Sequence, residues 1–307
     1  MQLLQLFRIP NLLILVATLY LVTIGVIHPP LVSNGLAPSM TTKDYLLFLF
    51  IALCVGAGGY LYNDLMDVEA DTHNERKPVI GRTITRKAIM FAYWFLVVGA
   101  LFLVLALSIE IERLDLIPVY LFFVVLLWSY NRFFQKVPFI GNIIVAGLCS
   151  SAVFIPYYLE YPVLNVLARE DAPSYQIMIA ILGGFFVFSF LSNLIREVIK
   201  DLQDIEGDRL AGYQTAPVYY GELFCKKVSF VLTVLLALSI IVWSWIIYRE
   251  QALLGMLSLG ILIPPHFWLG HLSRNVHNRD DYGKLSLHWK AYMVLGIVYL
   301  IILINWI

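Results

Sequence analysis

Residues 44–71 read DYLLFLFIALCVGAGGYLYNDLMDVEAD, an apolar run that ends in a cluster of acids. A helix that crosses a bilayer needs about 20 predominantly apolar residues, and positions 44–62 supply that length. Charged clusters separate this run from others of the same kind at 10–28, 88–109, 114–130, 139–159, 174–195, 226–248, 252–270 and 288–307. The sequence therefore predicts an all-α polytopic membrane protein with nine transmembrane helices. We expect one domain over residues 1–307, folded as a single bundle whose central cavity opens to the cytoplasmic side.

Composition supports a membrane protein and excludes two other classes. The chain has 307 residues, of which 60% are hydrophobic and 14% are charged, whereas about a quarter are charged in soluble domains. Lys plus Arg and Asp plus Glu number 21 each, so no basic excess exists to bind nucleic acid. The three cysteines, Cys54, Cys149 and Cys225, are scattered and odd in number, which excludes a disulfide-stapled domain.

The distribution of basic residues predicts the orientation in the membrane. The amino terminus and the loops after the second, fourth, sixth and eighth runs hold 17 Lys and Arg residues, and the other loops hold 4. Short cytoplasmic loops carry the excess of Lys and Arg. We therefore expect a multi-pass protein of the cell membrane whose amino terminus and even-numbered loops are cytoplasmic and whose carboxyl terminus lies outside.

Two acidic motifs follow predicted spans on this cytoplasmic side. Their members are Asn63, Asp64, Asp67 and Asp71 after the second span, and Glu197, Asp201, Asp204 and Asp208 after the sixth. In both motifs three aspartates have the spacing i, i+3, i+7, and on an α-helix these positions fall within about 60° of one another. Each motif therefore predicts one acidic stripe, from which Glu69 and Glu206 point away. One stripe could be a solvated helix end, but the recurrence of the spacing 137 residues later favours a functional site.

Facing carboxylates repel unless cations neutralise them. Mg²⁺ prefers oxygen ligands and usually shares its coordination shell with substrate phosphate. The six histidines lie outside both motifs and form no zinc-like set. The sequence therefore predicts two Mg²⁺ ions as cofactors, with these candidate ligands: Asn63, Asp64, Asp67, Asp71, Asp201, Asp204 and Asp208.

A phosphate-containing substrate should also meet fixed positive charge. Candidates lie in the same cytoplasmic loops: Arg76, Lys77, Arg82, Arg132, Lys136 and Lys200. Lys200 and Arg196 are interleaved with the second acidic stripe. The chain has no Gly-x-x-x-x-Gly-Lys-Ser/Thr phosphate loop, which argues against ATP hydrolysis.

The motif Asn-Asp-x-x-Asp-x-x-x-Asp after the second helix, with Asp-x-x-Asp-x-x-x-Asp after the sixth, resembles the UbiA superfamily of intramembrane prenyltransferases. The resemblance covers almost the whole chain. The stretch Arg196 to Asp208, with Gly212, Thr215 and Pro217 after it, is similar to the ether-lipid branch, the digeranylgeranylglyceryl phosphate synthases. So is the stretch Tyr130 to Asn142. The loop Glu75 to Arg82 departs from the usual family pattern because it has no serine and one residue fewer.

The resemblance implies Mg²⁺-dependent transfer of a polyprenyl group from a polyprenyl diphosphate to a lipophilic acceptor. The favoured acceptor is a prenylglycerol phosphate, which gives an ether lipid. The acidic residues implied to be catalytic are Asp67, Asp71, Asp201, Asp204 and Glu197, and the basic loop residues would bind the diphosphate. The expected partners are these two substrates and the bilayer, with no nucleic acid and no obligate protein partner.

Three alternatives remain open from the sequence. An aromatic quinone precursor could accept the prenyl group by the same chemistry. A phosphorylated acceptor, in contrast, needs basic groups beyond those that serve the diphosphate. The candidates for these groups are Arg274, Arg279, Lys284 and Lys290. A cation-coupled transporter could also use intramembrane carboxylates, but both motifs lie at one membrane face. A lipid-binding scaffold gives no reason for the repeated motif.

Overall fold

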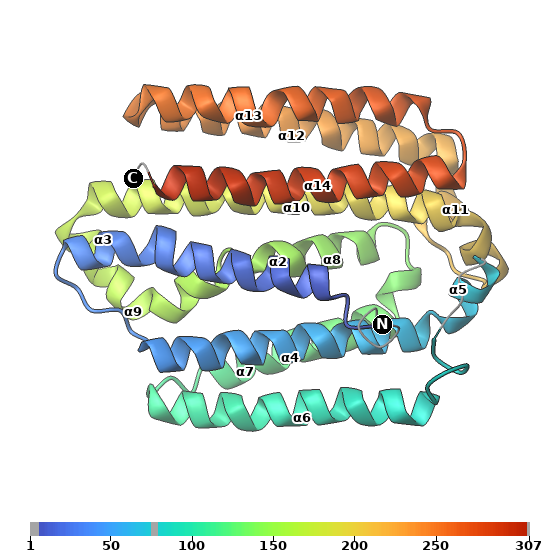
Figure 1. Cartoon of the computed structure of the whole chain (residues 1–307), viewed down its shortest axis with the longest axis horizontal. Coiled ribbons are helices and arrows are strands. Elements are labelled where there is room, and N and C mark those ends of the chain that lie inside the picture. The colour runs from blue at the N-terminus through green and yellow to red at the C-terminus, as the bar shows by residue number, and fades with distance from the viewer. Residues whose placement is uncertain (1–5, 75–78, 306–307) are drawn as a thin grey trace. The chain divides into compact units, whose positions relative to one another are not determined.

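The computed structural model describes residues 6–74 and 79–305, which are all-helical, with no β-strand in these ranges. The elements in chain order are α2 (Ile9–Tyr20), the π-helix η1 (Leu21–Ile27), α3 (His28–Ser33), α4 (Thr42–Met66), α5 (Val68–His73), α6 (Arg86–Glu110), α7 (Leu116–Arg132), η2 (Phe134–Lys136), α8 (Ile140–Ser151), α9 (Ile155–Glu170), α10 (Ala172–Leu210), α11 (Ala216–Tyr220), α12 (Glu222–Glu250), α13 (Ala252–Leu272), η3 (Ser273–Asn275) and α14 (Arg279–Ile304). Figure 1 labels the α-helices along the chain.

Seven helical segments in the described residues are long and apolar enough to cross a membrane. The number rises to eight if α8 and α9, which meet at a 48° bend, form one broken span. The helix α7 is apolar but has only 17 residues. The predicted all-α, multi-pass membrane fold is therefore confirmed.

The predicted fifth span, 139–159, is divided between α8 and α9. Pro156 lies in the first turn of α9. A proline inside a continuous helix lacks an N–H donor and its ring clashes with the carbonyl four residues earlier. The chain therefore leaves the helix before Pro156 and begins a new one.

The chain forms two compact units. Unit 1 contains Met1–Ala17, Ser39–Gly141 and Glu206–Gln214, and unit 2 contains Thr18–Pro38, Asn142–Ile205 and Thr215–Ile307. The helix α10 contributes residues to both units without a break.

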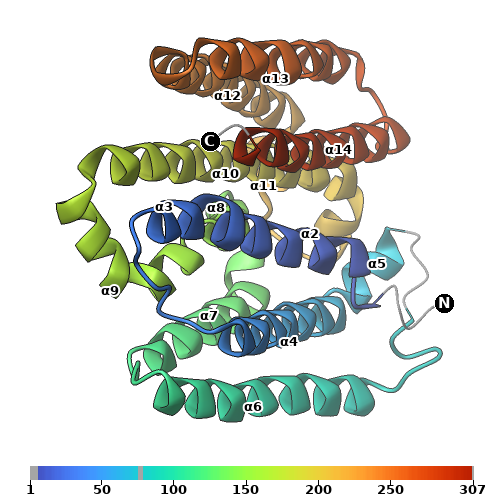
Figure 2. The same cartoon turned by 60° about the vertical axis from the view of Figure 1, so that its left-hand side comes forward.

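In unit 1, α4 packs beside α6 and α7 (Figure 2). The helix α4 begins with a capping box, in which Thr41 and Asp44 each accept a hydrogen bond from the other's backbone N–H. Glycines allow α4 to approach its neighbours closely, because a Cβ on Gly59 would lie 3.3 Å from a Leu127 methyl. Small residues are typical of helix contacts in membranes, where packing rather than the hydrophobic effect holds helices together.

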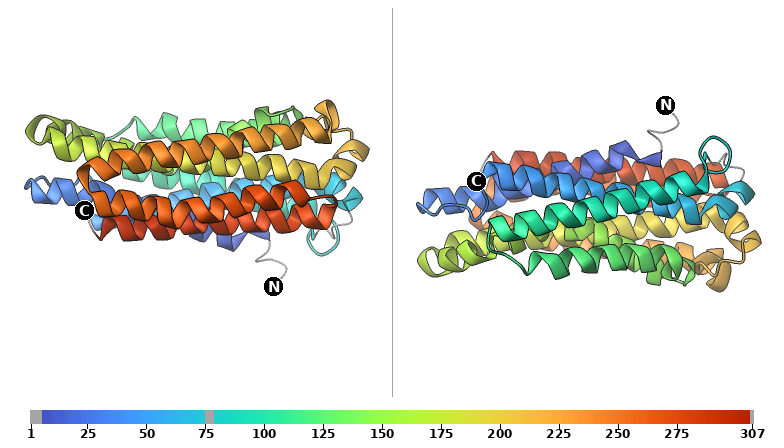
Figure 3. Two further views of the ribbon diagram at one scale, coloured as in Figure 1. Left: turned by 90° about the horizontal axis from the view of Figure 1, so that it is seen from above. Right: turned by 90° about the horizontal axis from the view of Figure 1, so that it is seen from below.

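Unit 2 is also held together by hydrogen bonds and by close packing of side chains against glycine. The helices α12 and α13 run side by side in all views (Figure 3). The Trp243 indole donates to the carbonyl of Ala180 over 3.1 Å, and it occupies the space that a Cβ on Gly184 would need. His266 is buried and its Nε2 lies 2.8 Å from the carbonyl oxygen of Thr233, so this histidine supports packing between α12 and α13.

Candidate active site

Asp67 occupies the junction between α4 and α5 in unit 1. Its backbone (φ −88°, ψ 0°) interrupts the helix, so the predicted continuous stripe from Asp64 to Asp71 is divided between two helices. Gln135 Nε2 donates to both Asp67 carboxylate oxygens, at 2.7 and 2.8 Å. These contacts fix the position of the carboxylate from outside its own helix.

Amide side chains extend this arrangement. Asn63 Nδ2 donates to Asp67 Oδ2 at 3.0 Å and to Asn131 Oδ1 at the same distance. Burial raises the pKa of the Asp67 carboxyl to about 6, and the Asp71 and Asp64 carboxylates act in the same direction, while the Gln135 hydrogen bond opposes them. Burial and the neighbouring carboxylates thus disfavour the charged form of Asp67.

Arg8 supplies one fixed cation to the first motif. Its Nη2 donates to Asn63 Oδ1 at 2.9 Å and to Asp64 Oδ1 at 2.6 Å, and its guanidinium lies over the Tyr60 ring at 5.1 Å. The Arg8 backbone has φ +46°, in the left-handed region. The protein itself thus neutralises Asp64, which distinguishes this carboxylate from Asp67.

The end of α10 belongs to unit 1 and packs beside the first motif. Tyr213 donates to the carbonyl of Met66 at 3.4 Å, and the Lys136 ammonium lies 4.4 Å from the centre of the Tyr213 ring. A Cβ on Gly207 would clash with the Asn74 side chain, so only glycine permits this approach. Asp208, the last member of the second motif, is therefore buried in the same unit as Asp67.

The remainder of the second motif lies on α10 in unit 2. Glu197 is buried, with Arg196 Nη1 3.2 Å from one carboxylate oxygen and Lys200 Nζ 2.8 Å from the other. Asn142 Nδ2 donates to Asp201 Oδ2 at 2.8 Å. Asp204 lies one turn further along, so α10 carries the predicted stripe without interruption.

The two glutamates expected to point away from the stripes do so. Glu69 is exposed. Glu206 is also exposed and pairs with Arg209 at 3.2 Å.

The predicted basic residues divide into three groups. Arg82, Arg132 and Lys136 are exposed in unit 1, Lys200 bonds Glu197 in unit 2, and Arg76 and Lys77 lie outside the described residues. Sequence reasoning missed the roles of Arg8, Gln135 and Tyr213. The position of Gln135 could have indicated its role, because it lies beside Lys136 in a short loop that is predicted to be on the same side of the membrane as both acidic motifs.

The donor chemistry of the motifs fits Mg²⁺. Around Asp67 the available ligands are carboxylate and amide oxygens, which hard divalent cations prefer. No group of three His, Cys, Asp or Glu side chains within residues 6–74 and 79–305 is already gathered at metal-binding distances.

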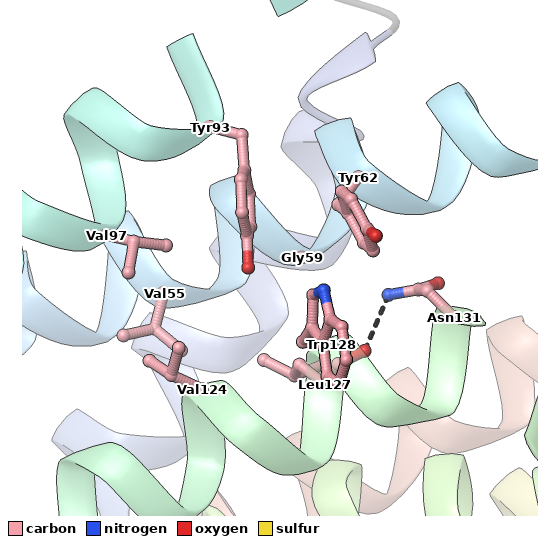
Figure 4. A pocket seen from close by; sticks show the side chains of 9 residues that line it. All are labelled: Val55, Gly59, Tyr62, Tyr93, Val97, Val124, Leu127, Trp128 and Asn131. Carbon is pink, nitrogen blue, oxygen red and sulfur yellow. Dashed lines mark hydrogen bonds between the residues drawn. The ribbon is translucent and has the colours of Figure 1, made fainter. Parts of the chain in front are cut away.

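A small apolar cleft lies between α4, α6 and α7 (Figure 4). Its lining residues are Val55, Gly59, Tyr62, Tyr93, Val97, Val124, Leu127, Trp128 and Asn131. Tyr62 and Tyr93 stack with ring centroids 4.8 Å apart. Asn131, which donates to the carbonyl of Leu127 at 2.8 Å and accepts from Asn63, connects this cleft to the first motif.

Comparisons with known proteins agree with these features. Residues 20–290 match the model of the UbiA prenyltransferase family. The chain is 28% identical to a digeranylgeranylglyceryl phosphate synthase of Methanopyrus kandleri over 81% of its length and 83% of the relative. It is 31% identical to the Sulfolobus acidocaldarius protein of that name, over 72% of its length and 74% of the relative.

Two solved structures share the fold. One, from a study of digeranylgeranylglyceryl phosphate synthase in membranes, has a TM-score of 0.59 at 20% identity, covering 98% of this chain and 96% of the other. The second is a UbiA homolog from Archaeoglobus fulgidus bound to DMAPP and Mg²⁺, with a TM-score of 0.57 at 15% identity, covering 96% and 97%.

The chain is a multi-pass helical membrane protein with two acidic motifs, and a prenyltransferase model matches most of its length. These features define an intramembrane prenyltransferase. The chain belongs to the UbiA prenyltransferase family. This membership excludes the transporter and scaffold alternatives.

Proposed function

We propose that the protein transfers a polyprenyl group from a polyprenyl diphosphate to a prenylglycerol phosphate in a Mg²⁺-dependent reaction, giving an ether lipid. The observation that carries the proposal is that one compact unit contains residues of both acidic motifs, Asp67 and Asp71 of the first and Asp208 of the second. The names of the curated relatives support the acceptor. The Archaeoglobus fulgidus homolog bound to GPP and Mg²⁺ supports the donor class and the metal.

The metal ligands we propose come from both motifs and hold two ions. They are Asn63, Asp64, Asp67, Asp71, Asp201, Asp204 and Asp208, of which Asp64 is already paired with Arg8. Bound Mg²⁺ supplies the charge neutralisation that lets diphosphate leave. Arg76, Lys77, Arg82, Arg132 and Lys136 stabilise the same leaving group electrostatically.

In the reaction the bond between the allylic carbon and the diphosphate oxygen breaks, and diphosphate leaves with the electron pair. The acceptor hydroxyl oxygen forms the new bond to that carbon, and its proton passes to a carboxylate. Both oxygens of Glu197 already face cationic side chains. Glu197 and Asp201, which lie one turn apart on α10, are the two candidate bases.

We propose one domain of nine transmembrane helices around a cavity that opens to the cytoplasm. This count treats α8 and α9 as one broken span and includes α7. The amino terminus is cytoplasmic and the carboxyl terminus lies outside. The donor tail and the acceptor enter from the bilayer, and no obligate protein partner is needed.

The test is incubation of purified protein and Mg²⁺ with labelled polyprenyl diphosphates of several lengths and a panel of acceptors, followed by mass spectrometry. The expected product is an acid-stable ether that retains the glycerol phosphate. If only aromatic acceptors were consumed at saturating donor, the proposed acceptor would be wrong.

A further inference from the structure

Three charged side chains of α10, those of Arg196, Glu197 and Lys200, form a compact group. Glu197 lies between Arg196 and Lys200, at 3.2 and 2.8 Å. Arg196 and Lys200 are four residues apart and so lie on the same side of the helix. The group carries one net positive charge beside the acidic stripe.

One donor of this group is unused. Arg196 Nε is buried and has no hydrogen-bond partner. A buried N–H group without a partner costs about 1–3 kcal/mol, so buried donors are normally bonded to something. The remaining charge and the unused donor together indicate a place for an anion.

The chemistry of the two substrates indicates which anion it is. A diphosphate would be held largely by Mg²⁺ and its carboxylate ligands, and exposed cations of unit 1 are available to it. A phosphate monoester on the acceptor lacks such a bridge and needs direct contacts with cations. Arginine is well suited to this task because its guanidinium presents several donors in one plane.

We infer that Arg196 and Lys200, held in place by Glu197, bind the phosphate of the acceptor lipid. The inference rests on the proposed function and assigns Lys200 to the acceptor instead of the diphosphate. Of the four alternative candidates, Arg274 and Lys284 are exposed, where water weakens ion pairs, and Arg279 and Lys290 are half-buried. Arg196 is partly buried, with 22% of its side chain accessible, so its contacts with an anion are stronger.

The test compares two acceptors in the purified full-length enzyme: a prenylglycerol phosphate and the same prenylglycerol without phosphate. The variants are Arg196→Gln, Arg196→Lys and Lys200→Gln. The control is Arg209→Gln, which changes an exposed arginine of the same helix. Donor KM, acceptor KM and direct binding of the phosphorylated acceptor to donor-free enzyme are measured.

We expect Arg196→Gln to raise the KM and the Kd for the phosphorylated acceptor about 10- to 100-fold, the range for loss of a hydrogen bond between charged groups. Turnover of the phosphate-free acceptor and the donor KM should change less than about threefold. Arg196→Lys keeps a cation beside Glu197 but removes Nε–H, so it should fold normally and show an intermediate loss. Lys200→Gln should resemble Arg196→Gln.

Equal losses on both acceptors, or a rise in donor KM alone, would overturn the inference while leaving the proposed function intact. If the unmodified enzyme used only aromatic acceptors, the proposed function would fail and the inference with it. An Arg196→Lys variant that folds and binds the phosphorylated acceptor as tightly as the unmodified enzyme would also contradict it.

Discussion

At the residue scale, the Asp67 carboxylate depends on an uncharged neighbour, because both of its oxygens accept hydrogen bonds from Gln135. Residues that orient a metal ligand typically change metal affinity or activity 10- to 100-fold when removed. Gln135→Leu should therefore raise the Mg²⁺ concentration for half-maximal activity about tenfold. Gln135→Glu, which places a negative charge beside Asp67, should lower turnover further. An unchanged Mg²⁺ requirement in Gln135→Leu would show that this amide does not position Asp67.

The acidic residues themselves provide a second prediction. Asp67→Asn and Asp204→Asn each remove charge from a proposed metal site at nearly constant side-chain volume. We expect turnover to fall at least about 100-fold, the scale of losing an electrostatic contact in a transition state, while the protein remains folded. The controls Glu69→Gln and Glu206→Gln change exposed side chains of the same segments and should retain turnover within about twofold. Similar losses in all four variants would contradict the assignment of the sites.

At the element scale, the sequence predicts the helices well because apolar runs of membrane length have few alternative structures. It does not predict the partner of the Asp67 carboxylate, because Gln135 is 68 residues away along the chain. Arg8 illustrates the same limit. Its charge enters the count of basic residues on which the predicted orientation rests, but its contact with Asp64 is visible only in the folded structure. The contact of Asn142 with Asp201 likewise joins different helices.

Adjacent glycines of α10 offer a test of helix packing. A Cβ on Gly184 would lie 2.1 Å from Trp243 Nε1, whereas a Cβ on Gly183 would meet nothing within 4 Å. Gly184→Ala should therefore destabilise the protein by about 1–3 kcal/mol, the usual cost of overpacking. Gly183→Ala should be neutral or stabilising by up to about 1 kcal/mol, because alanine favours a helix. Thermal unfolding in detergent measures both, and equal midpoints would refute this close contact.

At the scale of the whole molecule, the orientation rests on the 17 basic residues of the amino terminus and even-numbered loops. Single cysteines introduced at Lys77 or Arg209 should react with an impermeant thiol reagent only from the cytoplasmic side. A cysteine near Arg169 should react only from outside. Parallel labelling in a background without the native cysteines provides the control. Reaction of the Arg169 position from the cytoplasm would overturn the nine-helix arrangement.

The central claim is that an acceptor hydroxyl oxygen captures the prenyl group. The most direct test uses a prenylglycerol phosphate with ¹⁸O in that hydroxyl, together with a polyprenyl diphosphate and Mg²⁺, and analyses the product by mass spectrometry. We predict an ether that retains the ¹⁸O and the glycerol phosphate, forms only with Mg²⁺, and is nearly absent with Asp67→Asn. A prenylated product without ¹⁸O, or the absence of any ether product at saturating donor and Mg²⁺, would contradict the claim.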